Sequence, residues 1–285
     1  MTDAPRGVYA LRARTLDEVA ESLTEPGAML LAGGQSLLPR LRSTPLSQGL
    51  LVDLSGVEAL RQCTLADGWI RLGSTMTHSA IARSRTILEN APRLAAIAGL
   101  IGDEEVRNRG TLGGALREPH PRSDWAACLT ALDTTLEVIR PGDGRSTVPL
   151  RDYLSNDDLR NEVHLIVEAR LRPEALASFH YERQAGDAAG GPNCSIAVST
   201  SYDGVHISKC NIVVTGAAPR TFIATASEEA LCGTTATKEH VDAAAALLCD
   251  GVTLLDDSEG DPKYRAHLIG SRFTTAIREL LRTAP

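Results

Sequence analysis

Residues 28–36, AMLLAGGQS, join a short apolar run to two consecutive glycines. The run at 28–32 predicts a buried strand, and Gly33 and Gly34 predict a turn at its end. Glycine readily adopts left-handed backbone conformations, so such a turn can direct several N–H groups to one point and hold a phosphate. Gln35 and Ser36 would add side-chain donors. The alternative is a simple turn between two strands, since glycine is a common turn residue.

A second glycine loop lies within residues 106–124, VRNRGTLGGALREPHPRSD. The three glycines and two prolines of this segment predict that it is neither a helix nor a regular strand. Thr111 places a hydroxyl beside the glycines, and Asp124 could accept hydrogen bonds from ribose or ribityl hydroxyls. The alternative for Asp124 is the N-terminus of a following helix, a position that Ser123 also suits.

The pattern of the two loops narrows the class of ligand. Neither loop matches G-x-G-x-x-G or a Walker A motif, which argues against a Rossmann dinucleotide site and a P-loop ATPase. Two glycine loops of another type fit one long ligand that carries a pyrophosphate in its middle. Because spacing alone does not require the loops to converge, the residues themselves predict only a nucleotide-like cofactor.

Other stretches predict strands and helices without strict alternation. Asp203-Gly204, between the runs 195–200 and 205–216, is a strong hairpin signal. The pattern favours an α+β fold over a doubly wound sheet. Pro173 follows the strand-like run 163–171 and predicts a domain boundary. Further strands are expected at 50–54, 69–72, 135–139 and 146–148, and helices at 15–23, 125–132, 225–232, 238–249 and 261–281, with two more within 78–98.

The composition excludes several classes of protein. With 285 residues, 43% hydrophobic and 23% charged, the chain has the make-up of an ordinary globular protein of one or two domains. A formal net charge of -7 without Lys-rich or Arg-rich runs argues against nucleic-acid binding. No apolar stretch is long enough to span a bilayer, and the N-terminus MTDAPRGVYALRAR has no signal-peptide segment, so a cytoplasmic location is expected.

The cysteines and histidines do not have metal-ligand spacing. No two of the six cysteines form a C-x-x-C or another close pair, and no H-x-x-x-H occurs. We therefore expect no metal, no iron–sulfur cluster and no disulfide framework in this chain. Aromatic residues make up only 4% of the chain, so aliphatic side chains and glycine backbone would have to enclose a planar cofactor.

At the glycine loops the sequence resembles the FAD-binding subunit of the molybdenum hydroxylases, a family that includes the medium chain of carbon monoxide dehydrogenase and the flavin domain of xanthine dehydrogenase. The family's A-G-G-Q-S-L-L-P stands at 32–39 and its I-R-N-x-G-T-x-G-G at 106–114. Its G-A-x-T-x-H corresponds to 73–78, its P-x-S-D to 121–124 and its Y-R-x-x-L to 264–268. The match covers essentially the whole chain.

The resemblance implies an FAD-binding PCMH-type domain of the vanillyl-alcohol-oxidase class at residues 1–173. A small C-terminal domain of antiparallel sheet packed on helices, similar to that of the carbon monoxide dehydrogenase flavoprotein, would follow at 174–285. In such proteins the flavin takes electrons from a two-iron, two-sulfur small subunit fed by a molybdopterin-binding large subunit, and passes them to NAD, oxygen or a quinone-type acceptor. The chain would then be an FAD-dependent oxidoreductase subunit whose complex binds the substrate at molybdenum.

The resemblance also assigns residues to parts of FAD. The first loop would wrap the pyrophosphate, the second would hold another stretch of the cofactor, and residues 123–124 would bind the polyol. Ile101, Val163 and His164 align with positions beside the isoalloxazine ring. Arg183 aligns with a basic residue near the pyrimidine edge, where a positive charge would stabilise anionic reduced flavin. The expected cofactor-binding residues are Leu31, Ala32, Gly33, Gly34, Gln35, Ser36, Leu37, His78, Ile101, Gly110, Thr111, Gly113, Gly114, Ser123, Asp124, Val163, His164 and Arg183.

Several positions depart from the family pattern. Ala115 stands where Asn or Ser is usual, and Met76 where Thr is usual. A bulkier turn at 117–121, REPHP, replaces A-H-A-D-P, and the segment 190–194 has no aromatic residue, which would leave one face of the flavin more open. Two alternatives to the complex subunit follow: a free-standing FAD-dependent dehydrogenase or oxidase acting on a small or carrier-bound substrate, and a cofactor-free scaffold subunit.

The motifs contain no residue that predicts general acid–base catalysis. His78 and His120 lie nearest to them, but a single loop histidine is commonly structural. We assign neither a catalytic role and expect electron or hydride transfer at flavin N5 instead.

Overall fold

The computed structural model describes residues 7–45, 47–185 and 191–283. By contacts between its residues the chain divides into two compact units. The first comprises Met1–Glu118 and Thr135–Arg170, and the second comprises Pro119–Thr134 and Leu171–Pro285, so far as these residues are described. Each unit is therefore built from two separate stretches of sequence.

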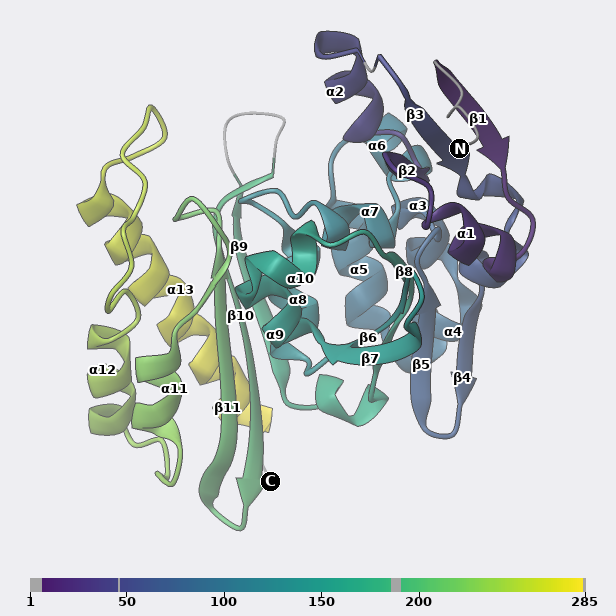
Figure 1. The fold of residues 1–285 in the computed structure, drawn as a ribbon. Helices are drawn as coiled ribbons and strands as arrows, with labels where there is room; N and C mark the ends of the chain where they lie inside the picture. Colours follow the sequence, from purple (N-terminus) through teal and green to yellow (C-terminus); the bar gives the residue numbers. More distant parts are fainter. Residues whose placement is uncertain (1–6, 46, 186–190, 284–285) are drawn as a thin grey trace. The chain divides into compact units, whose positions relative to one another are not determined.

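A small parallel sheet of the first unit carries the first glycine loop, between β2 and α2 (Figure 1). The strand order is β1-β3-β2. Residues 15–18, TLDE, have the S/T-x-x-E pattern of a capping box, which predicts a helix start at Thr15. Thr15 caps α1, because its hydroxyl accepts from Glu18 N at 3.1 Å. The strand predicted at 28–32 is confirmed as β2. The bounds are β1 Val8–Arg12, α1 Leu16–Ser22, β2 Ala28–Leu31, α2 Leu37–Ser43 and β3 Gly49–Asp53.

A larger sheet of the first unit has the order β4-β5-β8-β6-β7. Its pairs β4–β5, β6–β7 and β6–β8 are antiparallel. The hairpin predicted at 135–148 is confirmed as β6 and β7. The strands are β4 Cys63–Ala66, β5 Trp69–Gly73, β6 Thr135–Arg140, β7 Gly144–Pro149 and β8 Leu165–Leu171. Helices of this unit are α3 His78–Arg83, α4 Arg85–Asn90, α5 Pro92–Leu100, α6 Glu104–Arg109, α7 Leu112–Arg117, α9 Leu150–Ser155 and α10 Asp157–Asn161.

The segment 106–124 contains more helix than its glycines suggested, so the prediction of a non-helical segment was wrong. It includes the end of α6 and the whole of α7. Side-chain caps start both helices: Asp103 accepts from Val106 N at 2.8 Å, and Thr111 accepts from Gly114 N at 3.3 Å. Caps of this kind satisfy N–H groups that a short helix would otherwise leave open, which offsets the low helix propensity of glycine.

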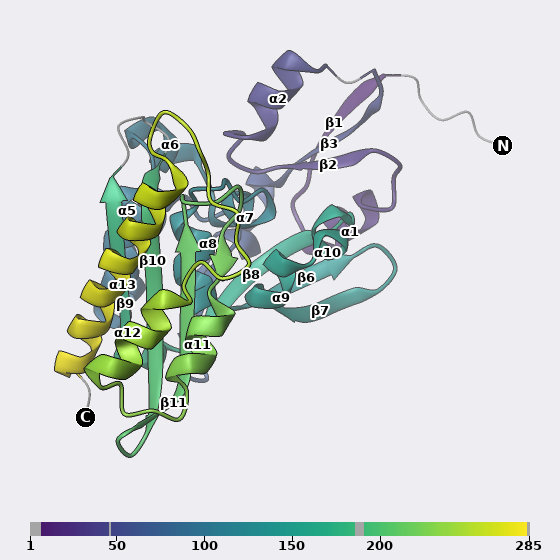
Figure 2. The same ribbon diagram turned by 90° about the vertical axis from the view of Figure 1, so that its left-hand side faces the viewer.

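The second unit is an antiparallel sheet packed on helices, as expected (Figure 2). The strand order is β12-β11-β10-β9. Residues 203–206 close the predicted hairpin between β10 and β11, and Gly204 has φ +59° there. The strands are β9 Phe179–Ala185, β10 Pro192–Asp203, β11 His206–Thr215 and β12 Phe222–Ile223, and the helices are α8 Asp124–Ala131, α11 Thr225–Leu231, α12 Lys238–Ala246 and α13 Pro262–Thr283.

Successive side chains of β10 point to opposite faces of the sheet, and helices pack against both faces. Ile196 and Val198 pack in one core with Phe273 of α13. Ser199, on the opposite face, donates to Ala131 O at the end of α8 at 2.5 Å, and Asn211 of β11 donates to the same oxygen at 2.9 Å. These buried bonds explain why 119–134 belongs to the second unit, although it lies inside the range 1–173. A sequence boundary at 173 therefore stays a prediction about domains and differs from the division by contacts.

Candidate functional site

The first glycine loop, residues 32–36, leads from β2 into α2. Gly34 has φ +73°, a left-handed conformation that favours glycine. Within the part of the chain that the structure describes, the N–H groups of residues 33–36 donate to no protein acceptor. Successive N–H groups left open in this way are what a phosphate-binding nest requires. The loop therefore fits the pyrophosphate of a nucleotide-like cofactor.

The second glycine loop, residues 109–114, uses its N–H groups within the protein. Gly113 N donates to Ser74 O at 2.7 Å, and Gly114 N donates to Thr111 Oγ1 at 3.3 Å. Gly113 is buried, whereas Gly114 is exposed. The structure thus gives Gly113 a packing role, and only the exposed edge of this loop is open to a ligand.

The two loops touch at Gly33. A Cβ atom added there would lie 1.9 Å from Arg109 O and 3.2 Å from Gly110 Cα, so the approach requires glycine. Both loops belong to the first unit. The structure therefore brings together two segments that the sequence spacing left unconnected.

His78 contacts the second loop through its backbone N–H group. Its N–H donates to Gly110 O at 3.1 Å, and the residue is 3% exposed. Burial, and to a smaller extent the charge of Arg107, lowers the pKa of His78 to about 4. The imidazole is therefore neutral near pH 7, and its position against Gly110 gives it a structural role in the loop.

The predicted ring-side residues differ in their surroundings. Ile101 is half-buried, and Val163 exposes 46% of its surface. His164 is buried, with Nε2 3.1 Å from Tyr153 Oη and Nδ1 2.9 Å from Glu162 O. Burial, followed by the charge of a nearby arginine, lowers the pKa of His164 to about 4. Both nitrogens of His164 are engaged within the protein, so Val163 is the more accessible member of that pair.

In the second unit the structure joins two predicted residues, Asp124 and Arg183. Asp124 Oδ1 lies 3.1 Å from Arg183 Nε, and the Tyr181 hydroxyl donates to the same oxygen. Burial raises the pKa of Asp124, while Tyr181 and Arg183 oppose the rise. Ser123 accepts from Ala126 N at 3.2 Å and caps α8, which confirms the helix-terminus alternative for Ser123.

Tyr181 was missed from the sequence. It lies two residues before Arg183 on β9, and the two side chains therefore share one face of that strand. The alternation of β9 was the signal that would have paired Tyr181 with Arg183. Only the structure identifies Asp124 as their common partner.

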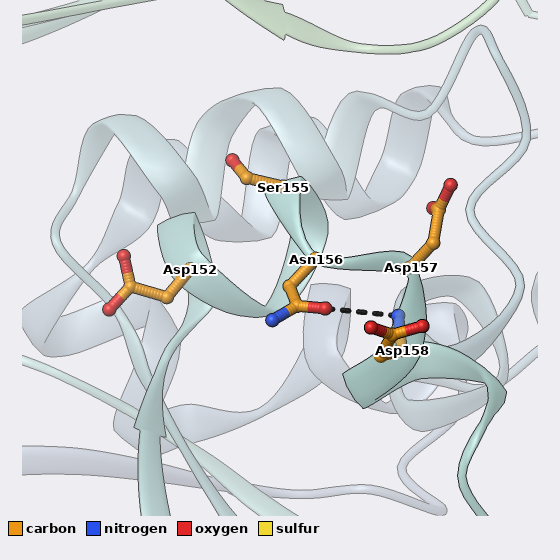
Figure 3. Close-up of a pocket in the computed structure, with 5 residues that line it drawn as sticks. All are labelled: Asp152, Ser155, Asn156, Asp157 and Asp158. Atoms are coloured by element: carbon orange, nitrogen blue, oxygen red, sulfur yellow. Dashed lines mark hydrogen bonds between the residues drawn. The ribbon is translucent and has the colours of Figure 1, made fainter.

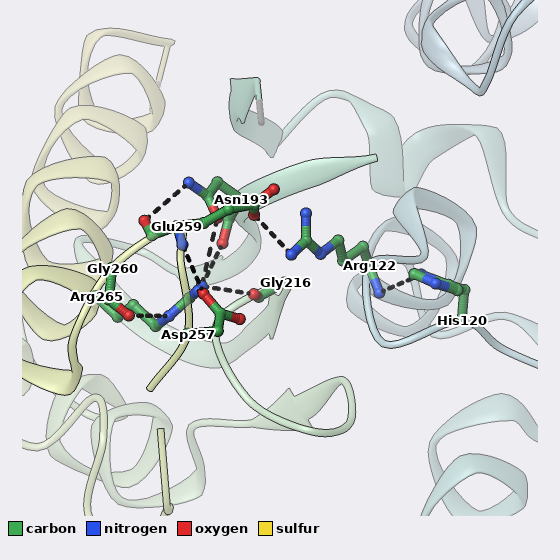
Figure 4. A network of polar contacts seen from close by, with 8 residues as sticks. All are labelled: His120, Arg122, Asn193, Gly216, Asp257, Glu259, Gly260 and Arg265. Atoms are coloured by element: carbon green, nitrogen blue, oxygen red, sulfur yellow. Dashed lines mark hydrogen bonds and ion pairs between the residues drawn. The ribbon is translucent and has the colours of Figure 1, made fainter. Parts of the chain in front are cut away.

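Charged groups fix the turn before Ser123 within the second unit (Figure 4). Arg122 Nη2 lies 2.6 Å from Glu259 Oε2, and both side chains are largely buried. Arg265, from the Y-R-x-x-L motif, is 1% exposed, donates to Gly216 O at 3.1 Å and pairs with Asp257. Arg265 therefore holds the backbone of several loops in place by hydrogen bonds to their carbonyl oxygens. The segment 190–194, expected to lack an aromatic cover, lies partly outside the described residues.

A surface hollow on α9 and α10 is acidic (Figure 3). Asn156 Oδ1 accepts from Asp158 N at 2.9 Å and so caps α10. Asn156 thus has a structural role at the helix end, and the hollow contains none of the predicted cofactor residues. The residues that line it are Asp152, Ser155, Asn156, Asp157 and Asp158.

Metal-binding clusters and membrane-spanning helices are both absent from the described ranges. No group of three or more His, Cys, Asp and Glu residues there is placed to hold a metal ion. None of the helices in those ranges combines the length and the hydrophobicity needed to cross a membrane. His120, the other histidine near the motifs, accepts from Arg122 N at 3.2 Å and belongs to the same turn as that arginine.

The α+β fold and the open N–H groups of the first glycine loop indicate a protein that binds a nucleotide-like cofactor. Comparison with known families makes the assignment specific. The family described as "FAD binding domain in molybdopterin dehydrogenase" matches residues 6–171, and "CO dehydrogenase flavoprotein C-terminal domain" matches residues 179–280. The chain belongs to the FAD-binding flavoprotein subunits of the molybdopterin dehydrogenases. The predicted family, fold class, cofactor and enzyme class are thereby confirmed.

Individual relatives align from end to end. The nicotine 6-hydroxylase medium subunit of Paenarthrobacter nicotinovorans is 28% identical over 95% of this chain and 96% of its own length. The carbon monoxide dehydrogenase medium chain of Hydrogenophaga pseudoflava is 30% identical over 88% of each chain. A solved structure of carbon monoxide dehydrogenase from Hydrogenophaga pseudoflava superposes with a TM-score of 0.85, at 27% identity over 99% of each chain.

Proposed function

We propose that this chain relays electrons within a molybdenum hydroxylase complex. Its FAD receives electrons from a two-iron, two-sulfur subunit, which a molybdopterin-binding subunit supplies, and passes them to NAD, oxygen or a quinone-type acceptor. Two observations support the proposal: two relatives that match over 96% and 88% of their own length are named as a medium subunit and a medium chain, and the first loop has open N–H groups. Of these, the open loop is the observation on which the cofactor role of this chain depends.

The first loop carries the charged middle of the cofactor in this proposal. The N–H groups of residues 33–36 receive pyrophosphate oxygens, and Gln35 and Ser36, both exposed, add side-chain donors. Leu31, Ala32 and Leu37 shape the ends of the loop. When bound, FAD supplies an isoalloxazine ring that accepts and returns electrons.

The second loop contributes a surface that the cofactor packs against, because the N–H groups of Gly113 and Gly114 already donate to protein oxygens. Gly110 and Gly113 allow close packing, whereas the exposed Gly114 leaves room for the cofactor next to Thr111. Thr111 keeps its hydroxyl proton for a ligand, because its oxygen already accepts from Gly114 N. His78 holds the loop and stays uncharged.

The remaining predicted residues contribute polarity and cover. The family pattern assigns Ser123 and Asp124 to the polyol and Ile101, Val163 and His164 to the ring. In the structure Ser123 also caps α8, and Asp124 is bonded to Tyr181 and Arg183. Arg183 brings a positive charge for reduced flavin, but its partner Asp124 reduces the effect of that charge. Each of these assignments rests on the family pattern.

The test uses the full chain produced with and without the proteins encoded beside its gene. A complex containing molybdopterin and iron–sulfur subunits, with one FAD per copy of this chain, supports the relay. Substrate-dependent bleaching of the flavin in the complex, but not in the chain alone, supports it further. A chain that binds no FAD either alone or in a complex refutes the flavin function, and bleaching by a substrate in the isolated chain favours a free-standing dehydrogenase.

A second measurement identifies the acceptor. Anaerobic mixing of the FAD-loaded protein with NADH bleaches the flavin if NAD is the acceptor, because electron transfer to NAD is reversible. An unchanged spectrum argues against NAD as the acceptor. Stopped-flow reoxidation of substrate-reduced complex by oxygen or by a soluble quinone then separates the other two acceptors.

A further inference from the structure

We propose that the ion pair between Arg40 and Glu118 positions the first glycine loop for the cofactor. The two side chains come from α2 and from the end of α7, and Arg40 Nη1 lies 2.8 Å from Glu118 Oε1. This proposal rests on the proposed binding of FAD at the two loops. It makes Arg40 and Glu118 positioning residues, which act on the cofactor through the loop backbone.

Helix α2 is weakly anchored by other means. It is seven residues long and contains no buried residue. Ser36, at its N-cap, makes no side-chain capping bond. In Figures 1 and 2 this helix lies beyond the ends of β2 and β3. Because apolar burial holds most helices in place, α2 and the loop before it depend on few contacts.

Glu118, by contrast, lies at the end of a helix that is packed into the core. It is the C-cap of α7, whose Leu112 and Leu116 are fully buried. Gly113 N in the same helix donates to Ser74 O at 2.7 Å. An interaction with Glu118 therefore ties α2 to a well-packed part of the first unit.

The ion pair and the Gly33 contact hold the first loop at two points. Gly33, the first residue with an open N–H group, packs on the backbone of Arg109, and Arg40 pairs with Glu118 after the last of these groups. Fixing both sides of the loop reduces the conformational entropy that the N–H groups lose when they bind an anion. The expected consequence is tighter binding of FAD without any contact between the ion pair and the cofactor.

A long-range electrostatic effect makes a different prediction. Arg40 could attract the anionic cofactor simply by its charge, and Glu118 would then repel it. On that account Glu118→Arg tightens FAD binding. On the positioning account Glu118→Arg weakens it, because two like charges then face each other across the gap.

The experiment measures the dissociation constant of FAD for the full-length chain, or for the complex if the chain binds FAD only there. The variants are Arg40→Glu, Glu118→Arg and the double exchange Arg40→Glu/Glu118→Arg. Each single variant is expected to weaken binding roughly two- to fivefold, the range for an exposed ion pair, and the exchange to return it to within about 1.5-fold of the wild type. Arg42→Glu is the matched control, since Arg42 is exposed on the same helix and forms no ion pair among the described residues.

The outcomes separate this proposal from the proposed function. A wild-type chain without FAD affinity, alone or in the complex, refutes the function itself. Normal FAD binding by the wild type and by all variants refutes only the positioning role. Tighter binding by Glu118→Arg, or equal losses in Arg40→Glu and Arg42→Glu, shows that charge acts at a distance. Each variant should melt within about two degrees of the wild type, because exposed ion pairs contribute little to stability. Differences in FAD affinity then do not come from unfolding of the variants.

Discussion

The two glycine loops have similar compositions but opposite hydrogen-bond states. In the first, the N–H groups of residues 33–36 have no protein acceptor within the described chain, whereas in the second Gly113 and Gly114 both donate to protein oxygens. The first loop is followed by a helix without buried residues, and the second by a helix anchored in the core. Glycine serves anion binding in one case and close packing in the other. Substitutions can therefore separate cofactor affinity from stability.

Gly33→Ala is expected to have the largest effect on the cofactor. Its Cβ would lie 1.9 Å from Arg109 O, so one of the two loops must move. Displacing the open N–H groups should raise the dissociation constant of FAD at least about 100-fold, measured by flavin fluorescence titration. Gly99→Ala is the control, because a Cβ at Gly99 meets no atom within 4 Å. Unchanged FAD affinity in Gly33→Ala would contradict the role given to the contact.

Gly113→Ala should act on stability instead. Its Cβ would lie 2.6 Å from Ser74 Cβ and 2.9 Å from Ser74 O, inside a buried contact. Such overpacking typically costs about 1–3 kcal/mol of unfolding free energy, measured by urea denaturation. The folded fraction should keep FAD affinity within about threefold of the wild type, which corresponds to less than ~0.7 kcal/mol. A protein of normal stability that has lost FAD would reverse the assignment of the two loops.

The pH dependence of stability tests the second loop by another route. The folded-state pKa of His78, about 4, lies below the ordinary value of 6.5, so between these values the unfolded chain binds more protons. Stability should therefore fall as pH falls from 6.5 towards 4, with a slope of up to ~1.4 kcal/mol per pH unit from this residue. His78→Asn should make the profile of melting temperature against pH less steep, and the contribution of His164, whose pKa is also lowered to about 4, should remain. His206→Asn, the same substitution at an exposed histidine of the second unit, is the control variant.

Thr111→Val should have the smallest effect. It removes the oxygen that accepts from Gly114 N and caps α7, a loss of about 1 kcal/mol in the free energy of unfolding. Thr111→Ser keeps the cap and should retain most of the stability, as measured by chemical denaturation. Equal stability of the Val and Ser variants would show that the cap contributes nothing to the second loop.

Much of the local structure followed from short sequence signals. The apolar run before Gly33, the Asp203-Gly204 turn and the Thr15 cap all lie where the pattern predicted them. Each of these features depends on residues close together in the chain. Helix α7 was missed because its cap, Thr111, had to outweigh two glycines, and propensity alone does not reveal that balance.

The contacts that could not be predicted join residues that are far apart in the sequence. The pairing of Asp124 with Tyr181 and Arg183 depends on α8 packing against the sheet of the second unit. The contact of Gly33 with Arg109 and the ion pair of Arg40 with Glu118 likewise join separate segments. No local periodicity encodes such contacts.

By itself the sequence determined the family, the α+β class, the cofactor and the positions of both glycine loops, because glycine conformations and family motifs are local properties of the chain. Only the tertiary structure decided that the first loop has open N–H groups, while Gly113 and Gly114 of the second loop donate to protein oxygens. The reason is physical: a backbone N–H is available to a ligand only when no carbonyl or hydroxyl from another segment reaches it, and packing determines which segments come within reach.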